Sequence, residues 1–112
     1  MKFVVKNISG KNVINLMREV GYHFRGTDQE RTELTFTHSL GPNSYPRFHI
    51  YLKENKETGE IIINLHLDQK RPIYKGVPAH AGEYEGKVVE TEAERIKQQI
   101  IQINEDLKKN RL

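Results

Sequence analysis

The chain has 112 residues, of which 36% are hydrophobic and 29% charged, and its formal net charge is +3. This length suits one domain with a single modest core, spanning residues 1–112. Because there is no cysteine, disulfides, thiolate metal sites and cysteine nucleophiles are excluded, and a reducing cytoplasm is the expected location. No apolar run approaches the about 20 residues that span a membrane, and polar residues interrupt every apolar run in residues 1–20. We therefore expect neither a signal peptide nor a membrane partner.

A first helix is predicted over residues 10–20, after a short strand or lead-in at residues 2–6. Four apolar residues recur at the spacing of one helix face: Val13, Leu16, Met17 and Val20. Ser9 is placed to cap the start of this helix. Gly21 suits the left-handed position at its end.

The apolar period then changes from 3.6 residues to two, which is typical of strands that bury one face. The alternating runs are residues 22–25, 32–38, 47–52 and 60–68, with turn-forming residues at 26–30, 41–44 and 55–59. The inward side chains of the last two runs are Phe48, Ile50, Leu52, Ile61, Ile63, Leu65 and Leu67. These runs predict three or four antiparallel strands.

Residues 69–88 show no period, and we predict a long loop there. Loops of this length in compact domains are usually functional or disordered, and this one carries aromatic and titratable residues rather than the composition of a disordered linker. A final helix is expected to begin at a capping box, with Thr91 as N-cap and Glu94 at the third helical position. Its apolar stripe contains Ala93, Ile96, Ile100, Ile103 and Leu107, with Ile101 on the flank.

The predicted fold class is α+β: a three- to four-stranded antiparallel meander with two helices packed on one face. The order α-β-β-β-α resembles the double-stranded-RNA-binding-domain topology. A helix followed by Gly21, Tyr22 and Arg25 resembles the opening of HicA-type toxins, which share that fold and are mRNA interferases. The resemblance covers about residues 9–53. The family's catalytic Gly-Ser-His has no counterpart, since residues 26–29 read Gly-Thr-Asp-Gln, and so no catalytic residue is carried over.

Alternate residues of a strand share a face, so the polar side of the predicted sheet collects hydrogen-bonding and titratable groups. Those of the last two strands are Arg47, His49, Tyr51, Asn64, His66 and Asp68, and Thr35 and Thr37 extend the set. Open sheet faces are often rich in such residues for β-propensity alone. The polar set is therefore explained either by β-propensity or by a functional site on this face.

We rank nucleic-acid binding first, with RNA ahead of DNA, through the open sheet face and the 69–88 loop. Tyrosine rings can stack on bases, while arginine and lysine neutralise phosphates. The candidate binding residues are Arg47, Tyr51, Lys70, Arg71, Tyr74, Lys75 and Tyr84. Tyr74 and Tyr84 would equally serve as packing anchors that hold the loop on the sheet.

Other classes of function remain open on overlapping residues. A histidine base oriented by an aspartate would suit phosphodiester cleavage, and the catalytic candidates are His49, His66, Asp68 and His80. A zinc or manganese ion in a metal-binding hydrolase is a lower-ranked alternative, with ligands from His66, Asp68, His80 and Glu83. No other cofactor is expected. A protein-interaction module is the last class, in which Ile101 supports a homodimer.

Overall fold

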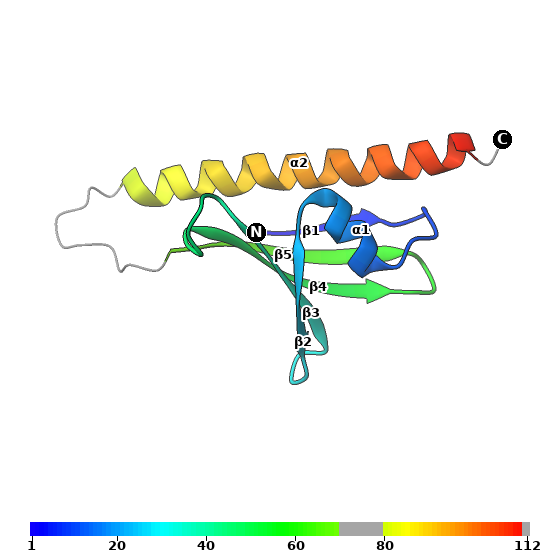
Figure 1. Ribbon diagram of the computed structural model, residues 1–112, viewed down its shortest axis with the longest axis horizontal. Helices are drawn as coiled ribbons and strands as arrows, with labels where there is room; N and C mark the ends of the chain where they lie inside the picture. Colours follow the sequence, from blue (N-terminus) through cyan, green and yellow to red (C-terminus); the bar gives the residue numbers. More distant parts are fainter. Residues whose placement is uncertain (70–79, 111–112) are drawn as a thin grey trace.

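The computed structural model describes the backbone of residues 1–69 and 80–110, and the side chains of residues 1–69 and 86–109. Within these parts the chain forms one antiparallel sheet, in the order β1-β5-β4-β3-β2, and two helices (Figure 1). The elements are β1 (Lys2–Lys6), α1 (Val13–Val20), β2 (His23–Asp28), β3 (Glu33–Ser39), β4 (Arg47–Asn55), β5 (Glu60–Asp68) and α2 (His80–Asn110). The α+β class is confirmed.

The sheet has five strands, so the predicted count of three or four is too low. The difference lies in residues 2–6, which pair antiparallel with β5. Lys2 faces Asn64 and Lys6 faces Glu60 across that pair. A short strand was one of the two alternatives predicted for residues 2–6, and their pairing with β5 shows that this alternative is correct.

Helix α1 begins at Val13 and is capped by Asn12, whose side chain accepts a hydrogen bond of 2.9 Å from the backbone N–H of Asn15. Ser9 is therefore not the cap. The end of the helix is as predicted, because Gly21 adopts the left-handed conformation with φ of 108°. All four apolar residues predicted for its inward face are buried.

Helix α2 begins at His80, well before the predicted start. Thr91 lies inside the helix, and its hydroxyl donates to the carbonyl oxygen of Lys87 at 2.9 Å. The predicted capping box is therefore wrong. Glu94, its other predicted member, has its Oε1 atom 3.4 Å from Nζ of Lys97 instead.

The early start of α2 also shortens the predicted 69–88 loop. Gly82 and Gly86 lower the helix propensity of this stretch. The local sequence pattern therefore does not predict a helix there. Val88 and Val89 pack against the core, and tertiary packing of this kind commonly outweighs propensity. Most of the rest of that predicted loop lies outside the described residues.

One hydrophobic core contains residues of both helices and of the sheet. Its buried members are Phe3, Val13, Leu16, Met17, Val20, Tyr22, Phe36, Phe48, Ile50, Leu52, Ile61, Ile63, Leu65, Ala93, Ile96 and Ile100. The alternation predicted for β4 and β5 is confirmed, with Leu67 half-buried beside its fully buried neighbours. No helix in the described part of the chain combines the length and apolar character that crossing a bilayer requires.

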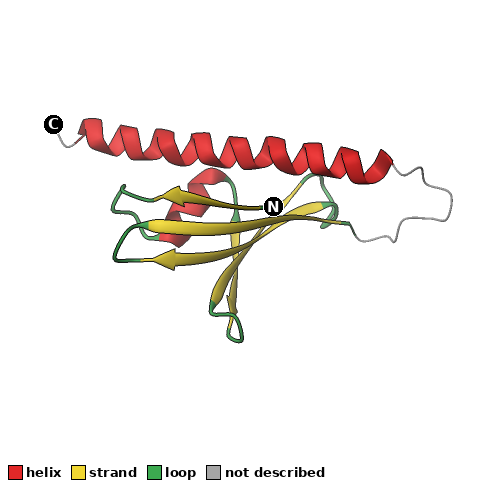
Figure 2. Cartoon of the chain, turned by 180° about the vertical axis from the view of Figure 1, so that it is seen from behind, coloured by secondary structure: helices red, strands yellow, loops and turns green. Residues whose placement is uncertain are grey.

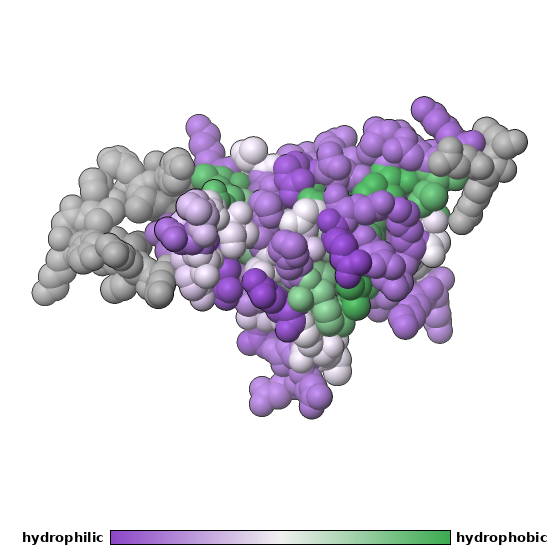
Figure 3. Space-filling model, in the orientation of Figure 1, coloured by the Kyte–Doolittle hydropathy of each residue, from purple (hydrophilic) through white to green (hydrophobic). Residues whose placement is uncertain are grey.

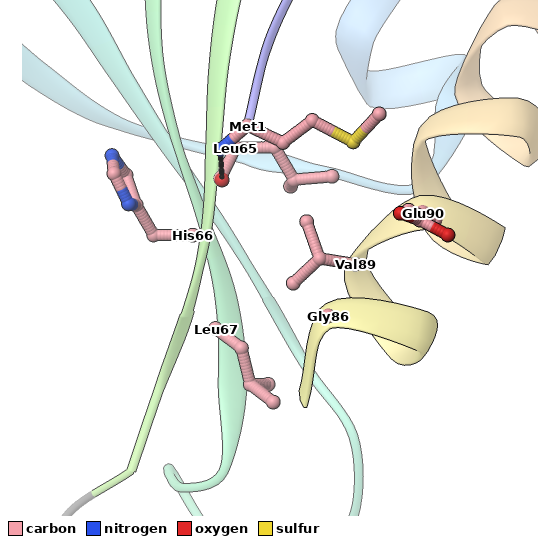
Figure 4. A pocket seen from close by; sticks show the side chains of 7 residues that line it. All are labelled: Met1, Leu65, His66, Leu67, Gly86, Val89 and Glu90. Atoms are coloured by element: carbon pink, nitrogen blue, oxygen red, sulfur yellow. Dashed lines mark hydrogen bonds between the residues drawn. The ribbon is translucent and has the colours of Figure 1, made fainter. Parts of the chain in front are cut away.

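The side of the sheet opposite this core is called the outer face below. Its residues are Lys2, Val4, Lys6, Arg25, Glu33, Thr35, Thr37, Ser39, Arg47, His49, Tyr51, Lys53, Asn55, Glu60, Ile62, Asn64, His66 and Asp68. Figure 2 shows the strands in front of α1, and Figure 4 shows His66 on the other side of β5 from Leu67 and Val89. Leu67 and Val89 line a hollow of about 450 Å³ between β5 and α2.

Candidate nucleic-acid interface

Three neighbouring strands bring the polar residues of the outer face into register. Across β3, β4 and β5 the facing residues form three rows: Ser39–Arg47–Asp68, Thr37–His49–His66 and Thr35–Tyr51–Asn64. Side chains that face one another on a sheet have Cβ atoms about 4.5–5.5 Å apart. The prediction that this polar set shares one surface is therefore confirmed.

Asp68 organises one end of this surface. Its Oδ2 atom lies 3.0 Å from Nδ1 of His49 and 3.5 Å from Nε of Arg47. A carboxylate only accepts hydrogen bonds, so Nδ1 of His49 carries the proton. This bond fixes the orientation of the imidazole and directs its Nε2 atom away from Asp68.

Tyr51 lies at the centre of an aromatic cluster. Its ring is stacked on His49, with 4.6 Å between ring centroids, and His66 approaches it edge-on at 6.0 Å. The guanidinium carbon of Arg31 lies 5.6 Å from the centroid of the tyrosine ring, a cation–π distance. Stacked and edge-on rings attract one another beyond the area they bury, so the cluster presents a fixed aromatic surface.

Arginines surround this cluster. The Nε atom of Arg25 donates to the hydroxyl of Thr37 at 2.8 Å, and the guanidinium of Arg47 lies over the ring of Tyr45 at 4.6 Å. Between them is a hollow of about 570 Å³ lined by Arg25, Asp28, Thr35, Thr37, Ser44, Arg47, His49 and Tyr51. Figure 3 shows the opposite side of the molecule, where α1 lies in front of the sheet; hydrophilic residues dominate that side, and hydrophobic residues form separate patches.

Sequence reasoning missed the contributions of Arg25 and Arg31 to this site. The pairing of β2 with β3 shifts between Phe24 and Gly26, and this bulge gives Arg25 its place on the outer face. A glycine inside a strand pattern is a signal of such a bulge. The position of Arg31 depends on Thr32, which follows it with a positive φ of 54°, and the sequence carries no clear signal of that turn.

The environment of His66 favours its neutral form. Partial burial lowers the pKa of His66 below the ordinary value of 6.5, and the amino group of Met1 and the ring of His49 lower it further. Asp68 acts in the opposite direction without reversing the shift. At neutral pH, His66 is therefore an uncharged ring beside Tyr51.

Several predicted site residues lie beyond the described side chains. Lys70, Arg71, Tyr74 and Lys75 lie outside the described residues, and His80, Glu83 and Tyr84 lie in the first turns of α2 with side chains outside the description. Among the side chains that are described, no three from His, Asp and Glu gather as a group that could hold a metal ion. The predicted metal ligands were His66, Asp68, His80 and Glu83, and the side chains of the last two lie outside the described residues.

Searches of protein-family models, curated proteins and solved structures found no match to the chain.

Proposed function

We propose that the outer face of the sheet binds single-stranded nucleic acid, with RNA as the preferred partner. The observation that carries this proposal is the fixed aromatic surface of Tyr51, His49 and His66, with Arg31 and Arg47 beside it. Proteins that hold single strands combine stacking on aromatic rings with cationic groups that follow the phosphates. Both components occur here on one surface.

The form of the surface favours a single strand over a duplex. Stacking on Tyr51 requires a base whose face is exposed, and paired bases inside a helix do not offer one. Arg25 and Arg47 border the hollow beside this ring, where they are placed to contact the phosphates on either side of a stacked base. Lys70, Arg71, Tyr74, Lys75 and Tyr84 join the proposal on sequence grounds alone.

Fluorescence anisotropy with labelled single-stranded RNA, single-stranded DNA and duplex RNA tests the proposal. Wild-type protein is expected to bind single strands more tightly than duplex, with an affinity that falls as salt rises. Tyr51→Ala should weaken binding by about 10- to 100-fold, since stacking contributes about 1–3 kcal/mol per base. An absence of binding at low salt, or equal affinity of Tyr51→Ala and wild type, would overturn the proposal.

An arginine pair supplies a matched control. Arg31 lies over the Tyr51 ring, whereas Arg18 is exposed on α1, away from the outer face. Arg31→Ala should weaken binding and reduce its salt dependence, because one contact with a phosphate or base is lost. Arg18→Ala carries the same change of charge and should bind as wild type does.

RNA cleavage is a second candidate, favoured by the hydrogen bond between His49 and Asp68. A histidine held by a carboxylate is the arrangement of a general base. His49 would take the proton of a 2′-hydroxyl, whose oxygen attacks the adjacent phosphorus to give a 2′,3′-cyclic phosphate. The bond to the 5′-oxygen breaks, and solvent water would supply the proton to that leaving group, since His66 is uncharged at neutral pH.

The cleavage candidate requires no metal, so the assay is run in chelator. Wild-type protein should convert labelled RNA into fragments that end in cyclic phosphate. His49→Gln should abolish cleavage while still binding RNA through Tyr51. Intact RNA after long incubation with wild-type protein would remove this candidate and leave the binding proposal unaffected.

A further inference from the structure

The outer face continues past the aromatic cluster into an exposed apolar pair, Val4 and Ile62. These residues face one another across β1 and β5, and Ile62 also faces Lys53 on β4. Val4 is 54% exposed and Ile62 is 37% exposed. Two adjacent apolar side chains on the side of the sheet away from its core do not contribute to that core, and exposed apolar pairs can form part of a contact surface.

The apolar pair is continuous with the proposed binding surface. The row Lys2–Asn64–Tyr51 lies between the pair and the row that contains His49 and His66. Arg47 and Lys53 are six residues apart on β4, which corresponds to about 20 Å at the usual strand rise. A linear surface therefore runs from the arginines, across Tyr51, to the apolar pair.

The charges beside the pair favour a polyanion as its occupant. Lys2, Lys6 and Lys53 border it, and Glu60, which faces Lys6, is the acidic residue in the same rows. Lysines on an edge strand also oppose pairing with a second copy of the chain. Antiparallel pairing of two β1 strands centred on Val4 would set Lys2 of one copy against Lys6 of the other.

We infer that single-stranded RNA follows this surface and lays its sugars and bases against Val4 and Ile62 after passing Tyr51. The inference rests on the proposed function and extends it by giving the bound strand a path. Short strands would occupy only the Tyr51 end. Strands long enough to reach the apolar pair would bind more tightly, because apolar contact is added there to the attraction of Lys2 and Lys53 for phosphate.

A length series with matched variants tests the path. The probes are labelled oligouridylates of two and of about twelve nucleotides; the first is too short to extend from Arg47 to the apolar pair, and the second exceeds the length of the surface. For wild-type protein the longer probe should bind at least tenfold more tightly. Ile62→Gln removes the apolar contact without adding charge and should weaken binding of the longer probe several-fold, leaving the part of its advantage that Lys2 and Lys53 supply. Affinity for the shorter probe should stay unchanged.

Two further variants control for folding and position. Val4→Gln alters the more exposed member of the pair and should reproduce the effect of Ile62→Gln. Ile8→Gln makes the same exchange at a residue that is 60% exposed and outside the sheet, and it should bind both probes as wild type does. Circular dichroism melting establishes that each variant folds.

The possible failures are distinguishable. If neither probe binds wild-type protein, the proposed function fails and the path fails with it. If both probes bind and Ile62→Gln and Val4→Gln bind the longer one as wild type does, the path is wrong while the proposed function stands. Sedimentation with phosphatidylglycerol vesicles supplies the remaining outcome: vesicle binding that is lost in Ile62→Gln, with RNA binding unchanged, would assign the pair to a lipid surface and overturn the inference.

Discussion

Two polar clusters on opposite sides of the sheet are built in contrasting ways. In the closed cluster, on the core side, Tyr22 donates to Glu92 at 2.6 Å, and Arg95 donates to both oxygens of Glu92, at 2.6 and 2.9 Å. Arg95 also donates to the carbonyl oxygen of Val20 at 3.0 Å, at the end of α1. The open cluster of His49, Asp68, Tyr51 and His66 lies instead on the outer face.

The two clusters differ in how completely their hydrogen-bonding groups are paired within the protein. In the closed cluster Tyr22 is 1% exposed and Glu92 is 7% exposed, and buried polar groups of this kind are stable only when their hydrogen bonds are complete. Its partners belong to α1, α2 and the segment before β2, so it fixes α2 relative to the rest of the fold. In the open cluster His66 is exposed and Arg47, His49 and Tyr51 are half-buried, so part of each side chain remains for contact with a ligand. Loss of the closed cluster should therefore affect stability, and loss of the open cluster should affect binding.

Removal of the buried carboxylate should produce the largest effect. Glu92→Ala leaves the Tyr22 hydroxyl and the Arg95 guanidinium without their acceptor, which should lower the free energy of unfolding by about 3 kcal/mol. Urea denaturation measures this change. Glu94→Ala removes an exposed carboxylate from the same helix and should cost less than about 0.5 kcal/mol. Equal midpoints for the two variants would contradict a structural role for the closed cluster.

The contribution of the Tyr22 hydroxyl to the closed cluster can be recognised by its dependence on alkaline pH. Burial, aided by the hydrogen bond to Glu92 and its negative charge, raises the pKa of Tyr22 well above the ordinary value of 10.0. The folded state therefore keeps this tyrosine neutral, and its contribution to stability is complete below about pH 10 and declines above it as the unfolded chain ionises.

The Tyr22→Phe variant tests this linkage. It should cost about 1–2 kcal/mol at neutral pH through the lost hydrogen bond. Its free energy of unfolding should also fall less steeply than that of wild type above about pH 10, because phenylalanine does not ionise. Parallel pH profiles for the two proteins would show that Tyr22 ionises as readily in the folded state as in the unfolded chain.

The same contrast explains what the sequence could reveal. The period-two pattern of β4 and β5 separates a buried side from a polar one, so the rows of the open cluster could be predicted from strand geometry alone. Glu92 lies in a stretch whose local pattern matches a capping box, and only the contact of α2 with the segment before β2 shows it to be a buried hydrogen-bond acceptor of Tyr22. Local pattern reports which side of an element is apolar. It does not report which distant element supplies a polar partner.

A single change in the open cluster should strengthen RNA binding. Asp68→Asn removes the negative charge beside Arg47 and His49, so RNA should bind about two- to fivefold more tightly, in line with the about 0.5–1 kcal/mol typical of exposed charge pairs. For the same reason the free energy of unfolding should change by less than about 1 kcal/mol. Asp106→Asn, an exposed exchange on α2, controls for net charge and should leave the affinity unchanged. Weaker RNA binding in Asp68→Asn would show that Asp68 positions the arginine rather than opposing the phosphate.

The smallest expected effect concerns the protonation of His66, measured by NMR titration of its side chain. The pKa of His66 is expected below 6.5, and it should remain below 6.5 in His49→Gln, because partial burial is the largest cause of the shift and the ring of His49 a lesser one. Since the folded pKa is lowered, the folded state loses stability as pH falls below 6.5, where the unfolded chain takes up the proton first. A midpoint above 6.5 would mean that Asp68 outweighs burial and holds His66 as a cation. The open cluster would then contain a charged pair, His66 with Asp68, as the closed cluster does with Arg95 and Glu92.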